Sequence, residues 1–203
     1  MAIIRRLCAA ELSLLAALSI FFPSQAVACA CCTEIGQRFE QTGTLENYER
    51  GELSNVRFAS TAHLFTDPGF PDTVEGINNP LDQSYQVKVM QKPTEWIFDF
   101  VDAQGKTGRI VFPLPKRFSR FEIDPREVGQ TPGGNGPVLY KEWRLQGISK
   151  LSGNLAAKGA WAHARLILHG RGNGCTSAID FENWTLSVLG KQINFKFLGA
   201  TMR

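Results

Sequence analysis

The chain has 203 residues, 43% of them hydrophobic and 20% charged, and its formal net charge at pH 7 is +3. This length is enough for one domain with a sizeable hydrophobic core. The small, scattered charge argues against a nucleic-acid-binding protein, because no run of basic residues exceeds two.

The first 28 residues have the three parts of a secretory signal peptide. Arg5 and Arg6 form a positive region, residues 12–22 are an apolar run of 11 residues, and Ala26-Val27-Ala28 has the small-x-small pattern of a cleavage site. The alternative is a buried N-terminal helix. The apolar run is shorter than the about 20 residues that a membrane-spanning helix needs. We therefore expect residues 1–28 to be a signal peptide and the protein to be exported, to a periplasmic or extracellular location.

Cleavage after Ala28 removes Cys8 and leaves four cysteines, Cys29, Cys31, Cys32 and Cys175. An even number of cysteines in an exported chain is typical of disulfide bonds. The adjacent Cys31 and Cys32 can bridge each other only in a strained ring. We therefore expect one of them to pair with Cys175, which closes a loop of more than 140 residues. On a chain-entropy model such a bond contributes roughly 4 to 5 kcal/mol.

Three other roles for these cysteines stay open. Cys29 follows the cleavage pattern directly, so it is a candidate for lipid attachment, and only then would the protein be anchored to a membrane. Cys29, Cys31, Cys32 and Cys175 are also soft ligands that suit copper or zinc. Cys175 alone is a candidate nucleophile of a thiol enzyme, because Ser177 and Asp180 after it resemble a capping box whose helix would lower the thiol pKa.

Residues 29–53 form a polar, cysteine-bearing N-terminal arm. The pattern after Cys32 predicts one or two short helices, with Thr44 as a candidate N-cap and Gly51 as a candidate stop. From residue 54 to residue 203 the hydrophobic period changes to two, which indicates a single β domain.

Two β-hairpins are predicted from matching hydrophobic faces. Around Ala103-Gln104-Gly105, the register places Phe98 opposite Ile110 and Trp96 opposite Phe112. Around a two-residue turn at Gly190-Lys191, the apolar pairs are Val188 with Ile193, Leu186 with Phe195 and Trp184 with Phe197. Two hairpins with consistent faces predict an antiparallel sheet.

Further alternating segments raise the expected number of strands to eight or nine. They include residues 56–64, 85–89, 139–148 and 160–168, and a short strand near Phe121. The fold class is therefore all-β, an antiparallel barrel or a two-layer sandwich, with a short N-terminal helical segment. The small residues Ala160, Ala162 and Ala164 on one face favour the curved wall of a barrel.

The sequence contains no recognisable hydrolase motif and no marked pair of carboxylates, so it names no catalytic residue. His163 and His169 lie six residues apart on one strand face, roughly 20 Å from each other, with Arg165 between them on a face that we expect to be solvated. Long loops are expected at residues 66–84 and 129–137. The aromatic face of the sheet either packs as core or holds a small apolar ligand.

The leading hypothesis is an exported β-rich binding or interaction protein, with a small apolar ligand or a protein as partner. A copper or zinc protein and a thiol enzyme are the alternatives, and no cofactor is required by the leading hypothesis.

The first prediction concerns processing. We expect the exported protein to begin at Cys29, because the Ala26-Val27-Ala28 pattern follows an apolar core. N-terminal sequencing and intact-mass measurement check this directly. A mature chain that begins at Cys31, or one that keeps the leader, would contradict the prediction.

Overall fold

The computed structural model describes residues 36, 38–65, 74–77, 84–125, 139–172 and 177–202. The described residues contain ten strands, one α-helix and two short 3-10 turns. In chain order these are β1 (Arg38–Thr44), α2 (Asn47–Asn55), β2 (Arg57–Leu64), β3 (Ser84–Gln91), β4 (Glu95–Val101), β5 (Thr107–Pro113), β6 (Arg117–Ile123), β7 (Tyr140–Gly153), η4 (Asn154–Ala156), β8 (Trp161–Arg171), η5 (Ala178–Asp180), β9 (Phe181–Gly190) and β10 (Ile193–Met202).

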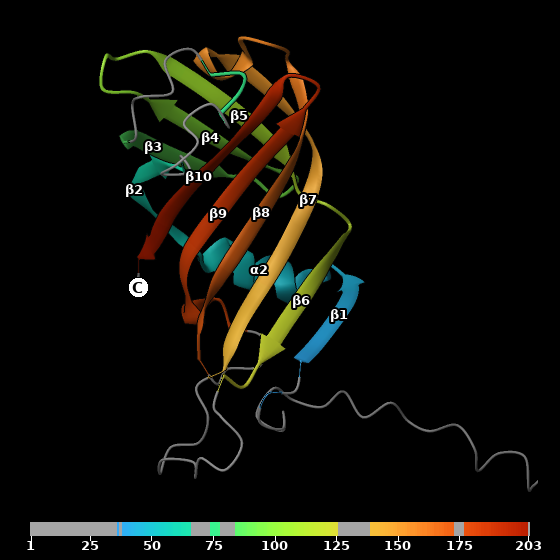
Figure 1. The fold of residues 1–203 in the computed structure, drawn as a ribbon. Coiled ribbons are helices and arrows are strands. Elements are labelled where there is room, and N and C mark those ends of the chain that lie inside the picture. The colour runs from blue at the N-terminus through green and yellow to red at the C-terminus, as the bar shows by residue number, and fades with distance from the viewer. Residues whose placement is uncertain are drawn as a thin grey trace, which may run out of the picture.

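Eight of the described strands close into an antiparallel barrel in the order β7-β5-β4-β3-β2-β10-β9-β8, with β8 pairing back onto β7 (Figure 1). Strands β6 and β1 continue the sheet from one half of β7, outside the closed ring. The all-β class and the barrel are thus confirmed, and the sandwich is excluded. The described strands exceed the expected eight or nine because residues 38–44 form the strand β1 instead of the expected helix.

The barrel interior is filled by aromatic rings that contact one another across the sheet. Phe58 lies edge-on to Trp96, Phe98 and Trp184, with ring centroids 5.5 to 5.7 Å apart. Phe100 stacks on Phe197 at 4.2 Å. Burying one large apolar side chain stabilises the fold by about 1.5–3 kcal/mol, so this cluster is a major source of the barrel's stability.

The N-terminal part of the described chain differs from expectation in one element. Residues 38–44 form strand β1, which pairs with β6, rather than a helix. The helix α2 follows with Glu46, not Thr44, as its N-cap, and it runs through Gly51 to Asn55. Its Leu53 is buried in the core. Local propensity did not reveal β1, because its polar sequence is stabilised by pairing with a strand far along the chain.

The β4–β5 hairpin has the predicted register, with Phe98 opposite Ile110 and Trp96 opposite Phe112. Gly105 adopts the left-handed φ of +79° that the three-residue turn requires. The buried carboxylate of Asp102 accepts hydrogen bonds from the backbone N–H groups of Gln104 and Lys106, at 3.0 and 2.8 Å.

The β9–β10 hairpin turns one residue later than predicted. Gly190 pairs with Ile193, so the loop is Lys191-Gln192 and each partner shifts by two residues. Because the side-chain period of a strand is two, the buried face stays the same. The shift places Trp184 opposite Gly199, where even a methyl side chain would overlap the indole ring. The observed register therefore gives the Trp184 indole ring the space that only a glycine partner leaves.

The second prediction tests the two faces of β9. Leu186 is fully buried in the core, whereas its neighbour Ser187 points outward. Leu186→Asp buries a carboxylate without a partner, which costs several kcal/mol, and we expect the melting temperature to fall by about 10 °C or more. Ser187→Asp is the matched control and should change stability by less than about 0.5 kcal/mol. Equal melting temperatures in thermal unfolding would mean that the assigned faces are wrong.

Candidate binding groove on the outer wall

The candidate site lies where strand β7 changes partners. The first half of β7 pairs with β6 through residues Tyr140 to Arg144, and its second half pairs with β5 through residues Lys150 to Gly153. Residues 145–149 of β7 lie between these two stretches, beside the short connection from the end of β5 to the start of β6. Gly147 lies at this switch, and Pro113 of β5 fills the space beside it, 3.2 Å from where a Cβ atom would stand.

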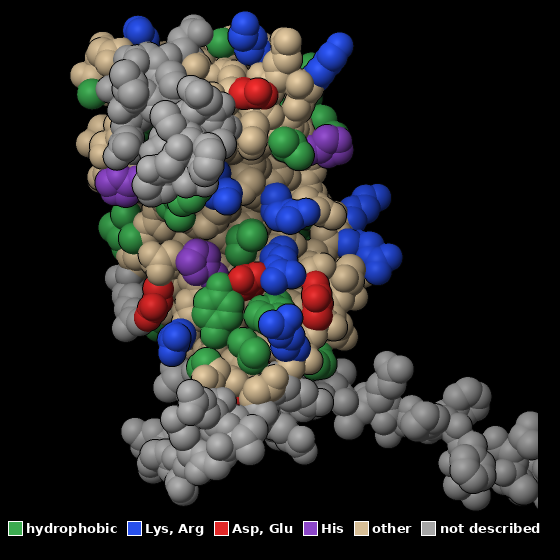
Figure 2. Space-filling view, in the orientation of Figure 1, with side chains coloured by type: hydrophobic (Ala, Val, Ile, Leu, Met, Phe, Trp, Pro, Cys, Tyr) green, Lys and Arg blue, Asp and Glu red, His purple; other side chains and the backbone are tan. Residues whose placement is uncertain are grey.

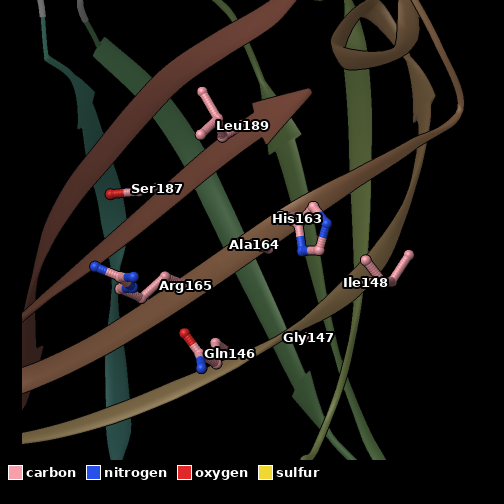
Figure 3. Close-up of a pocket in the computed structure, with 8 residues that line it drawn as sticks. All are labelled: Gln146, Gly147, Ile148, His163, Ala164, Arg165, Ser187 and Leu189. Atoms are coloured by element: carbon pink, nitrogen blue, oxygen red, sulfur yellow. The ribbon is translucent and has the colours of Figure 1, made fainter. Parts of the chain in front are cut away.

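A groove of about 540 Å³ crosses β7, β8 and β9 beside this switch (Figure 3). Two rows of outward side chains form its walls, and each row is set by cross-strand pairing. One row is Ile148, His163 and Leu189, and the other is Gln146, Arg165 and Ser187. Between the rows, the pairing of Gly147 with Ala164 keeps the floor low. The groove therefore has an apolar wall and a polar, cationic wall.

A second, smaller hollow continues the groove toward β6 and β1. It measures about 220 Å³ and shares Gln146 and Arg165 with the first. Its other lining groups include the guanidinium groups of Arg117 and Arg144 and the hydroxyl groups of Thr42 and Ser119. Arg165 thus stands where the two hollows meet.

The charge of this face is positive. Among the described residues, neither Arg165 nor Arg117 has a carboxylate within ion-pair distance. Lys196 lies next to Ser187 across the β9–β10 pair and places its ammonium group over the ring of Phe65. Figure 2 shows Lys and Arg side chains gathered over the middle of the face that β7, β8 and β9 present.

Arg144, by contrast, is neutralised by its neighbours. Its guanidinium group donates to Glu142 at 2.5 Å and to Glu40 at 3.2 Å, and it lies over the ring of Phe121. Tyr140 donates its hydroxyl to the same Glu142 at 2.6 Å. Arg144 is therefore a fixed wall of the smaller hollow, while Arg165 and Arg117 remain available to a ligand.

Burial is the largest cause of the pKa shifts of His169 on β8 and Tyr140 on β7. Burial lowers the pKa of His169, with nearby Glu142 opposing the shift. Burial also raises the pKa of Tyr140, and its hydrogen bond to Glu142 adds to the shift. Both shifts favour the neutral form of the side chain.

A second polar cluster is buried at the end of the barrel beneath η5. Lys141 is almost fully buried, and its ammonium group donates to Asp180 at 2.6 Å. Glu122 pairs with Lys141 across β6 and β7, and burial raises its pKa, while Lys141 and Arg120 oppose the shift. A buried lysine without such partners would cost several kcal/mol. The ion pair between Lys141 and Asp180 therefore holds η5 against β7.

Gly170 and Gly172 make room for this close packing of Asp180. A methyl group on Gly170 would overlap the carbonyl of Asp180, and one on Gly172 would overlap its carboxylate. The strand also has a register shift between His169 and Gly170. The Ser177 hydroxyl caps η5 by accepting from the Ile179 N–H at 3.4 Å, and the Asp180 carboxylate accepts from Lys141. Because η5 is a three-residue turn, it offers almost no macrodipole to lower a thiol pKa.

The cysteines singled out from the sequence, Cys29, Cys31, Cys32 and Cys175, all lie outside the described residues. So do residues 66–73, 78–83 and 126–138, which cover most of the two expected loops. Within the described part of the chain, no group of three or more histidine, cysteine or acidic residues is placed to hold a metal ion.

The histidines lie on the outer wall, as their strand face predicted. His163 is exposed and lines the groove, whereas His169 is half-buried beside Tyr140. Sequence reasoning treated Arg165 as an ordinary solvated residue and missed Gln146, Ile148, Ser187 and Leu189. The available signal was the placement of Ile148 and Leu189 at outward positions, where a solvated strand normally carries polar residues.

Comparisons with protein-family models, with curated proteins and with solved structures found no match to this chain. In the part of the chain that the structure describes, no helix is long and apolar enough to cross a membrane.

Proposed function

We propose that this is an exported binding protein that holds its ligand in the groove on the outer wall of the barrel. The observation that carries the proposal is the pairing of an apolar wall, Ile148 and Leu189, with a cationic wall at Arg165. A concave site that combines apolar surface with a few convergent polar groups is the usual form of a ligand site.

The alternative location, the barrel interior, has less support. Its aromatic side chains contact one another directly, as Phe100 and Phe197 do at 4.2 Å. Small barrels commonly fill their own interiors in this way. The ligand site therefore belongs on the outside, where the side chains are already accessible.

The third prediction tests the groove. A thermal-shift panel should contain neutral and acidic oligosaccharides, fatty acids, dinucleotides and short peptides. We expect at least one class to stabilise the protein by about 2.7 kcal/mol at one hundred times its Kd, a rise of several degrees in melting temperature.

Two variants assign the response to the groove. Ser187→Trp places an indole in the groove and should abolish the shift, whereas Gln86→Trp adds the same ring at an exposed position on β3 and should retain it. A panel without any response, or the same response from both variants, would overturn the proposed function.

We further propose that the N-terminal arm is tied to the barrel by a disulfide between Cys175 and Cys31 or Cys32. The described residues that flank these positions lie at one end of the barrel. Gly36 donates its N–H to the carbonyl of Asp124 at 3.1 Å, and Gly172 donates to Leu139 at 3.0 Å. Strands β1, β6, β7 and β8 lie side by side there, so Gly36 and Gly172 stand three strand spacings, about 14 Å, apart. Cys32 is four positions before Gly36 and Cys175 is three positions after Gly172, and these seven steps of chain can span about 23 Å when extended.

The fourth prediction follows from this bond. Cys175→Ser should release one free thiol in the arm and lower the melting temperature by several degrees, as expected for the loss of a native disulfide. Thiol titration under non-reducing, denaturing conditions and peptide mapping check both effects. Cys29→Ser is the matched control and should leave the bond to Cys175 intact. A reduced Cys175 together with thiols that become reactive only after chelation would replace the disulfide by a metal site, and a single fast-reacting Cys175 would favour a thiol enzyme.

A further inference from the structure

The groove carries more cationic charge than its own neighbours neutralise. Arg165 stands at the junction of the two hollows and Arg117 lines the smaller one, and neither has a carboxylate partner among the described residues. An arginine guanidinium group binds a carboxylate through two parallel hydrogen bonds. The groove and the smaller hollow beside it therefore suit a ligand that brings its own negative charges.

The positive positions follow the direction of the groove. Arg117 on β6 and Arg165 on β8 flank β7, so their backbones stand about 10 Å apart. Lys196 lies beyond Ser187 on β10. A ligand with a single anionic group would engage one of these cations, whereas an elongated ligand with repeated charges would engage several.

The remaining groups in the groove suit a sugar chain better than a peptide. Gln146, Ser187 and His163 supply amide, hydroxyl and imidazole groups that hydrogen-bond ring hydroxyls, and Ile148 and Leu189 offer an apolar surface for the C–H face of a ring. Strand β8 is paired on both sides by β7 and β9, and β9 is paired by β8 and β10. An extended peptide therefore finds no free strand edge here to extend.

We propose that the joined hollows bind an acidic oligosaccharide whose carboxylates contact Arg165 and Arg117. This inference rests on the proposed function and specifies its ligand class. The carboxylate of one sugar lies against Arg165, the next reaches Arg117, and the sugar rings lie along Ile148 and Leu189. Because the contacts are charged and exposed, binding weakens as the salt concentration rises.

Calorimetric titration of the exported protein with tetragalacturonate tests the inference. We expect saturable binding that weakens at least about tenfold in Arg165→Gln, the loss of about one charge-assisted contact. Arg165→Lys, which keeps the charge but not the forked geometry, should recover part of the affinity. The matched control is Arg109→Gln, which makes the same substitution on β5 at an arginine already paired with Asp99. This control should bind as the unmodified protein does.

Two further probes separate this inference from the proposed function. Maltotetraose, which is neutral, and tetraglutamate, which is an acidic peptide, should bind at least about tenfold more weakly than tetragalacturonate. If either binds better in the groove, or if Arg165→Gln and Arg109→Gln behave alike, the inference is overturned while the proposed function stands. A panel in which no ligand class responds to Ser187→Trp removes both.

Discussion

The closure of the barrel through β7 is the constraint on which the other features depend. This strand runs from Tyr140 to Gly153 and pairs with β8 along most of its length, while two different strands share its other edge. Closure gives each of the eight ring strands a hydrogen-bonded neighbour on both sides. It also fixes which side chains face inward and which face outward on every strand.

The division of β7 between two partners has a second consequence. Residues 145–149 of β7 lie between the stretch that pairs with β6 and the stretch that pairs with β5. Gly147 and Pro113 pack closely at this point. The candidate groove begins here, so the feature that closes the barrel also shapes the surface on which a ligand can lie.

The interior and the outer wall have different tasks. Inside, phenylalanine and tryptophan rings contact one another. The indole ring of Trp184 packs against Gly199, and this contact favours the observed register of the last hairpin. At one end, the buried pair of Lys141 and Asp180 holds η5 against the barrel. A core packed and fastened in this way keeps the outward rows of β7, β8 and β9 in place, which favours a preorganised binding surface.

Much of the fold was contained in local patterns of the sequence. Alternating apolar residues predicted the strands and their buried faces, and the Gly105 turn predicted the β4–β5 register, because a left-handed φ is a property of the turn residue itself. The polar strand β1 was not predictable in this way, since its pairing with β6 is supplied by residues about 80 positions away. The sequence pattern also did not predict the β9–β10 register, because the residue opposite Trp184 depends on the space that is available inside the closed barrel.

The candidate site was decided almost entirely by tertiary structure. The sequence by itself determined a barrel-forming pattern, a leader pattern and four cysteines after it. It could not bring Gln146, Arg165 and Ser187 into one row, because that row exists only after β7, β8 and β9 pair in register. Nor could it show that Arg165 lacks a carboxylate partner among the described residues while Arg144 has two, since ion pairing depends on distances between strands. Secondary structure follows from short-range periodicity, but the chemistry of this surface follows from long-range strand pairing.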